Sequence, residues 1–341
     1  MIMIKDKGIE LNEMLSKIER DDREKYDFRV RGKDLMINNE GRLVRKAYMG
    51  KEGLQFSEYA FTQLLNRYGL PVRETKKELL SNPEYVYGLV NELLNADENE
   101  LLIRARMIGG RGVVRAILSK DYTVLNNSQI INAVRENLEG TGLEYKVESV
   151  YIDDGRFHMR ITFDPTTQAF GRDIAGADDI IRSGVDIINS ETGRSSFRME
   201  PMIFRQVCSN GLKAWVGDED NERIVQRHIF ISTKELNDLV IRGISGSVET
   251  AQKVLNKFES TKKIVVMDPV KEIRRLCEDQ KLSNKLTENI VKAYEVEPMR
   301  SRYGIINAFT RGARDLGNVQ RLQLETFAGR LMTDESLFQV A

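Results

Sequence analysis

The sequence predicts an α+β protein, in which a central antiparallel sheet built from hairpins packs against helices and is followed by a helical C-terminal region. Between residues 101 and 163, apolar runs occur in pairs across turns rich in glycine or aspartate, as in β-hairpins. After about residue 232 the apolar residues recur at helical spacing. This change of pattern predicts two domains, residues 1–230 with the sheet and residues 231–341 with the helices.

The N-terminal third is expected to mix helices with short strands. Apolar residues at helical spacing predict an amphipathic helix over 8–24, and short strands with turns follow over 26–49. Ser57 is placed to cap a helix that ends near Gly69, because its hydroxyl can accept from a free backbone N–H. Another helix is predicted over 83–95.

The middle of the chain gives the clearest strand signals. Residues 101–108 and 113–118 are predicted to pair across glycines that turn the chain without strain. A helix that Ser128 caps comes next and ends at Leu138. Further strands are predicted at 145–152, 157–163, 184–189 and 195–204, and later helices at 233–243, 247–259, 268–280, 283–295, 301–315 and 318–332.

Composition narrows the class of protein. Lys+Arg and Asp+Glu both total 52 among the 341 residues, so only a local basic surface is compatible with nucleic-acid binding. Cys208 and Cys277 are the only cysteines, which indicates a reducing cytoplasm and no zinc framework. The sequence shows neither an apolar signal segment nor a run near the roughly 20 residues of a membrane span. We expect a cytoplasmic protein without a metal or a cofactor.

Arginines on the two hairpins form the main candidate site. Arg104 and Arg106 share one strand face by the period of two and are expected to face solvent. Such a row can contact phosphates, or it can be an ordinary solvated face whose charge nearby aspartates cancel. The C-terminal arginines are open to the same two interpretations. The candidate phosphate-contacting residues are Arg104, Arg106, Arg115, Lys120, Arg156, Arg160, Arg311 and Arg314.

Aromatic and acidic residues at strand ends are further candidates. Tyr122 or Phe157 could stack on a base, although such a tyrosine more often closes the edge of a core. Glu191 could ligate a metal together with Asp186, Asp153 or Glu200, but the sequence shows no compact acidic motif. Cys208 with His228 as base would be a nucleophile pair, and a buried structural cysteine is the commoner case.

Several short motifs together resemble a domain-of-unknown-function family whose members are usually labelled phage/plasmid-like proteins. They are Arg115-Ala116-x-Leu118-Ser119-x-x-Tyr122, Asn189-Ser190-Glu191-x-Gly193, Cys208-x-Asn210-Gly211, Tyr303-Gly304-x-x-Asn307-Ala308-x-Thr310 and Glu325-x-x-Ala328-Gly329. The resemblance covers roughly residues 55–332. It implies a mobile-element setting and supplies no catalytic residues.

These observations favour a non-enzymatic binder of single-stranded nucleic acid that serves phage or plasmid recombination, by strand annealing, or replication. The order hairpin–helix–hairpin resembles that of phage single-strand annealing proteins, which is an analogy of element order only. A metal-dependent nuclease and a protein-binding factor that acts on a host system are the alternatives. The expected partners are single-stranded nucleic acid, a host or phage protein and further copies of the chain, with no membrane.

Overall fold

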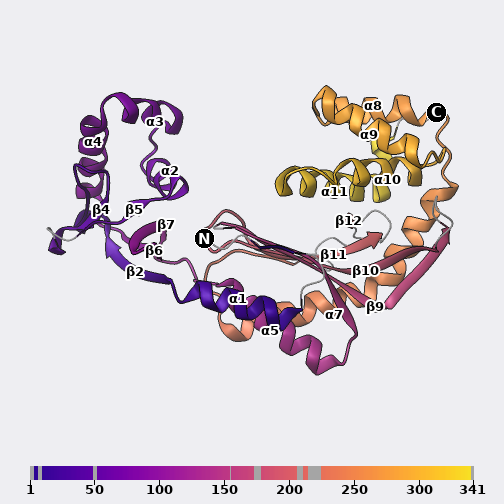
Figure 1. Ribbon diagram of the computed structural model, residues 1–341, viewed down its shortest axis with the longest axis horizontal. Helices are drawn as coiled ribbons and strands as arrows, with labels where there is room; N and C mark the ends of the chain where they lie inside the picture. Colours follow the sequence, from indigo (N-terminus) through magenta and orange to yellow (C-terminus); the bar gives the residue numbers. More distant parts are fainter. Residues whose placement is uncertain are drawn as a thin grey trace.

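The computed structural model describes residues 4–6, 10–48, 52–153, 155–172, 178–205, 210–213 and 224–338. It confirms the predicted fold class, since antiparallel hairpins build the central sheet and the chain ends in packed helices (Figure 1). Three hydrophobic clusters fill the molecule, one each in the N-terminal unit, around the central sheet and among the C-terminal helices. The domain boundary at residue 230 stays a prediction.

The central sheet is antiparallel throughout, with the order β1-β8-β9-β10-β11-β12, and β13 also pairs with β11. Strands β9 and β10 are longer than predicted. For β9 the prediction ended before Asp164 and Pro165, because both residue types disfavour strands in general, yet the strand continues through them. The strands are β1 (Ile4–Asp6), β8 (Tyr145–Ile152), β9 (Phe157–Arg172), β10 (Asp178–Asn189), β11 (Phe197–Arg205), β12 (Asn210–Lys213) and β13 (Ile224–Gln226).

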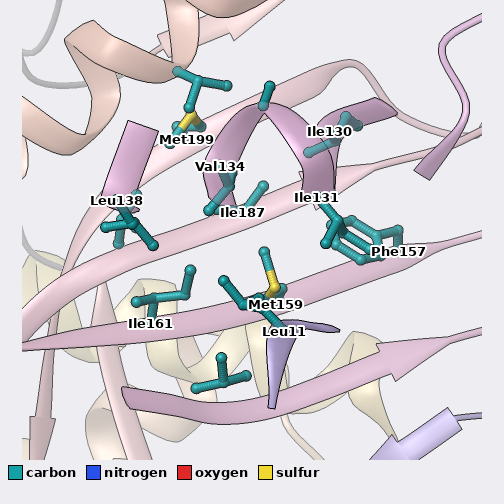
Figure 2. Packing of buried hydrophobic residues seen from close by; sticks show 14 of the residues in the cluster. Leu11, Ile130, Ile131, Val134, Leu138, Phe157, Met159, Ile161, Ile187 and Met199 are labelled. Carbon is teal, nitrogen blue, oxygen red and sulfur yellow. The ribbon is translucent and has the colours of Figure 1, made fainter. Parts of the chain in front are cut away.

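One face of this sheet is apolar and lies against three helices, α1 (Leu11–Asp22), α5 (Asn127–Thr141) and α7 (Thr233–Ser260). Alternate residues of β9, namely Phe157, Met159 and Ile161, point to this face and are fully buried. Figure 2 shows them packed with Ile131 and Leu138 of α5. A role for Phe157 in base stacking is therefore excluded, because its ring belongs to the core.

Helix α7 replaces two helices that the sequence predicts as separate. The break was expected between 243 and 247, where Gly243 and Gly246 interrupt the pattern, yet the helix runs through both. Gly243 packs closely against Met199, since a Cβ there would lie 2.8 Å from Sδ and Cε of Met199 and would require that side chain to shift. The apolar face of the helix on either side of the glycines therefore outweighs their low helix propensity.

The opposite face of the sheet is polar and is nevertheless covered. The C-terminal helices lie over it in Figure 1, and one of them contacts it through the buried ion pair between Arg160 and Glu325. These helices are α8 (Pro269–Asp279), α9 (Asn284–Val296), α10 (Arg302–Gly312) and α11 (Asn318–Thr333), close to their predicted positions. In the described part of the chain, no helix is long and apolar enough to cross a membrane.

The N-terminal unit has its own small sheet, in the order β2-β6-β7-β5, and its own apolar cluster. Its second helix, α3, was not predicted, because it is highly charged and follows a proline, which serves as N-cap rather than as a breaker. The elements are β2 (Lys25–Arg31), β3 (Leu35–Ile37), β4 (Leu43–Arg45), β5 (Gln55–Phe56), α2 (Glu58–Arg67), α3 (Val72–Ser81), α4 (Pro83–Ala96), β6 (Glu100–Ile108) and β7 (Arg111–Ser119). Short 3-10 turns lie at Gly32–Asp34, Lys46–Tyr48, Thr261–Lys263 and Glu335–Leu337.

Candidate functional site

The arginines of the first hairpin do not face solvent, and that prediction is wrong. Arg104, Arg106 and Arg115 are only 0%, 1% and 2% exposed. Arg106 pairs with Asp21 at 2.6 Å, and Arg104 Nε donates to Asp27 at 3.0 Å. Asp21 of α1 and Asp27 of β2 lie 85 and 77 residues before their arginines, and the local sequence of the hairpin gives no sign of them.

Glu191 is the centre of this buried network. Arg115 Nη2 donates to its Oε2 at 2.7 Å, Lys25 Nζ lies 2.9 Å from the same oxygen, and the backbone N–H of Asn127 donates to Oε1 at 2.9 Å. Arg104 donates to the Glu191 carbonyl at 2.7 Å. We call these five residues the Glu191 cluster. Burial would raise the pKa of Glu191, but Lys25, Arg115 and Arg104 together lower it to about 2.

The cluster joins the N-terminal unit to the central sheet. Lys25, Arg104 and Arg115 come from strands of the N-terminal sheet, whereas Glu191 follows β10 and Asn127 begins α5. The two motifs that the sequence singles out, around residues 115–127 and 189–193, therefore meet at one internal junction. With its oxygens held by cations and a backbone donor, Glu191 is a structural residue in this arrangement and not an open metal ligand.

Tyr122 belongs to the same junction. Its hydroxyl donates to the carbonyl of Ser190 at 2.9 Å, and its ring stacks on His228 with centroids 5.0 Å apart. Burial raises the pKa of its phenol. The structure therefore gives Tyr122 the role of an edge-closing residue, with one ring face already occupied by His228.

The second hairpin is also not the open basic surface that was expected. Arg160 is 1% exposed, and its Nη1 donates to Glu325 of α11 at 3.1 Å, while Asp186 lies 3.5 Å from its Nε. His158 is paired with the same Asp186. The prediction of a solvated face failed because α11, more than 150 residues later, covers it. Arg156, in the turn before β9, remains exposed.

The remaining candidates are scattered. Arg311 pairs with Glu297 at 3.2 Å, whereas Lys120 and Arg314 are exposed. Cys208 lies outside the described residues. Within the described ranges, no group of three or more His, Cys, Asp or Glu is placed to hold a metal ion.

A basic groove lies between the polar face of the sheet and α11. It has a volume of about 690 Å³. Four arginines line it, Arg156 in the turn before β9, Arg194 after β10, Arg198 on β11 and Arg330 on α11. None of the residues described as lining it is an aspartate or a glutamate. We call this hollow the arginine groove.

The groove combines charge with apolar surface. Its apolar wall comes mainly from α11 and the turn between α8 and α9, with Leu282, Val319, Leu322 and Phe327. Arg156 and Arg194 are exposed, and Arg330 Nη2 lies 3.9 Å from the carboxylate of Asp334. Such a surface suits a ligand with several negative charges and flat or apolar parts.

Sequence reasoning found Arg156 but missed Arg194 and Arg198 as candidates. A signal was present, because Arg194 directly follows the Asn189–Gly193 motif. The glutamate is the chemically conspicuous residue of this motif, and only the tertiary structure shows that the motif presents the next residues to a groove.

Comparison with known proteins gives a family without an activity. The model of the family described as Domain of unknown function (DUF932) matches residues 115–327. This confirms the predicted domain-of-unknown-function family over a shorter range than the motifs suggested. No curated protein and no solved structure matched the chain.

Proposed function

Because the chain belongs to the DUF932 family, whose description states no activity, we propose its function from the structure: it binds single-stranded nucleic acid in the arginine groove without acting on it chemically. The observation that carries this proposal is the set of four arginines, with no carboxylate among the described lining residues. Arginine offers a planar fork of donors that matches phosphate oxygens. The proposed phosphate-binding surface is therefore this groove and not the row of hairpin arginines that the sequence suggested.

Local charge separation reconciles this proposal with a formal net charge of zero. The charges of the hairpin arginines are neutralised by buried ion pairs, as between Arg106 and Asp21 and between Arg160 and Glu325. Two groove arginines, Arg156 and Arg194, are not buried in this way and stay exposed. A basic surface can therefore attract phosphates although the whole molecule is neutral.

The size and lining of the groove favour a single strand over a duplex. Its volume of about 690 Å³ is that of a small-ligand site, which suits a few nucleotides at a time. Apolar side chains such as Val319 and Leu322 provide surface for unstacked bases and sugars. In a duplex the bases are stacked inside and cannot reach such a wall.

The test is the salt dependence of oligonucleotide binding. The double variant Arg156→Ala with Arg330→Ala should bind a single-stranded oligonucleotide more weakly and flatten the plot of log affinity against log salt by roughly 0.7 per lost phosphate contact. Arg73→Ala is the matched control, because Arg73 is an exposed arginine on α3. Unchanged binding in the double variant, or an equal loss in the control, would overturn the proposal.

We place this binding in the cytoplasm, in phage or plasmid recombination or replication, with the chain acting as a homo-oligomer. Support comes from the sequence motifs and from the scarcity of cysteine.

A protein-binding factor is the second candidate, favoured by Phe230, which is 76% exposed and adjoins the exposed Ile229. That function predicts no salt-dependent affinity for oligonucleotides, so the same titration separates the two.

A further inference from the structure

Arg194 at the edge of the arginine groove is backed by an aromatic ring from the N-terminal unit. Its guanidinium carbon lies 3.9 Å from the centroid of Tyr59, which belongs to α2. Arg194 itself is exposed and lines the groove. The two planar groups are thus in contact, and Arg194 presents this contact at the wall of the groove.

We propose that the Arg194–Tyr59 pair is a stacking subsite for one nucleic-acid base, which deepens the function proposed above and rests on it. Guanidinium groups and phenol rings both stack on the face of a base, whatever its sequence. Contact with the electron-rich ring also keeps the guanidinium plane from rotating freely. Arg194 would then contribute more than a positive charge.

The surroundings hold this pair in place. Gln63, one turn after Tyr59, donates to the Thr192 carbonyl at 3.0 Å and accepts from the Ile117 N–H at 3.0 Å. The loop that carries Arg194 is thereby tied to α2. Gly155 makes room for the side chain, since a Cβ there would lie 2.3 Å from Nε of Arg194. A fixed platform loses little entropy when a base stacks on it.

The charge near Tyr59 agrees with this geometry. Burial raises the pKa of the Tyr59 phenol, while Arg194 and Arg156 act against that rise. Both cations of this end of the groove therefore lie close to the ring. Phosphates held by Arg156 would leave an adjoining base within reach of the pair. Tyr59 lies outside the matched family range, so the N-terminal unit would supply part of the subsite.

The experiment compares an oligothymidylate with the same strand carrying abasic positions, using the full-length protein. Arg194→Lys keeps the charge and loses the plane, and Tyr59→Leu keeps bulk and loses the ring. Each should weaken binding of the oligothymidylate about 10-fold and leave binding of the abasic strand unchanged. Tyr59→Phe is the matched control and should behave like the wild type. Thermal denaturation of each variant checks that the fold is retained.

The outcomes separate this subsite from the groove. If Arg194→Lys still prefers bases over abasic positions as strongly as the wild type, the proposed subsite is wrong. If Arg156→Ala with Arg330→Ala nevertheless weakens oligonucleotide binding, the arginine groove remains the binding site. An equal loss on both strands would make Arg194 a phosphate contact only and would also reject the subsite. A wild-type protein that binds neither strand overturns both proposals.

Discussion

His228 is a buried residue whose ionisation is opposed by its surroundings. It is 4% exposed, and its ring stacks on that of Tyr122. Burial and the nearby charge of Arg104 lower its pKa to about 4, from an ordinary 6.5. The imidazole is therefore neutral in the folded protein at pH 7, and its protonation would place an uncompensated charge in the junction.

We predict from this that His228 makes the fold sensitive to mild acid. Because the folded pKa lies below the unfolded one, the unfolded chain binds the proton first, and stability falls as the pH drops from 6.5 to about 4. The loss should reach about 3 kcal/mol at the lower end. Urea unfolding of the wild type and of His228→Phe at pH 7.5 and pH 4.5 measures it. Equal pH dependence in both proteins would show that His228 is not the cause.

At this scale the sequence located the important residues but not their environment. The period of two correctly places Arg104 and Arg106 on one strand face, and both are ion-paired. Their burial could not be predicted, because the partners Asp27 and Asp21 are distant in sequence. The absence of a compact acidic motif argued against a metal role for Glu191, but its three cationic neighbours could not be foreseen from the sequence.

At the level of elements, two glycines of α7 with opposite surroundings give a matched pair of variants. Gly246 has no atom within 4 Å of an added Cβ, whereas one at Gly243 would contact Met199 at 2.8 Å. Gly246→Ala should stabilise the fold by about 0.5–1 kcal/mol, since alanine loses less backbone entropy in a helix. Gly243→Ala, the same change, should destabilise it by about 1–3 kcal/mol through overpacking against Met199.

Thermal and urea denaturation of both variants measure these changes. The sign of each change in the free energy of unfolding is the informative result. If two separate helices were broken at 243–247, both substitutions would be tolerated alike. A gain from both variants would contradict the tight contact between α7 and β11, where Met199 lies.

Elements with strong local signals were predicted well. The first hairpin, with positive φ at Gly109 and Gly110, and the four C-terminal helices lie near their expected positions. Errors arose where tertiary packing outweighs local preference, as in the continuous α7 and in the extension of β9 past Asp164. Helix α3 was missed for a different reason. Its sequence is mostly charged, and its apolar pattern is too weak to be recognised as a helix.

For the whole molecule, the decisive feature is that the central sheet has two different faces. Residues 157, 159 and 161 of β9 point into the apolar core, while His158 and Arg160 point to the C-terminal helices. The sequence predicted this alternation and assigned the polar side to solvent. A polar sheet face under helices is stable only where its charges find partners, and Glu325 is the partner that α11 supplies.

Glu325 therefore holds the C-terminal helices over the sheet. Its side chain is fully buried and accepts from Arg160 and from Arg321, the latter at 3.0 Å. Burial lowers the pKa of Arg160, but Glu325 and Asp186 raise it overall, so its charge stays and needs a counter-charge. Glu325→Gln should lower the free energy of unfolding by about 3 kcal/mol or more, because a buried cation loses its main partner.

Urea denaturation gives that loss, and hydrogen exchange locates it, with amides of α11 expected to exchange faster while those of α5 keep their protection. Asp334→Asn, at the residue that directly follows α11, is the control. Asp334 lies at the surface, 3.9 Å from Arg330, and the variant should cost less than about 1 kcal/mol. A loss in Glu325→Gln no larger than in this control would mean that apolar contacts alone hold α11 in place. The arginine groove, which α11 walls, would then owe its shape to Phe327 and its neighbours rather than to the buried ion pair.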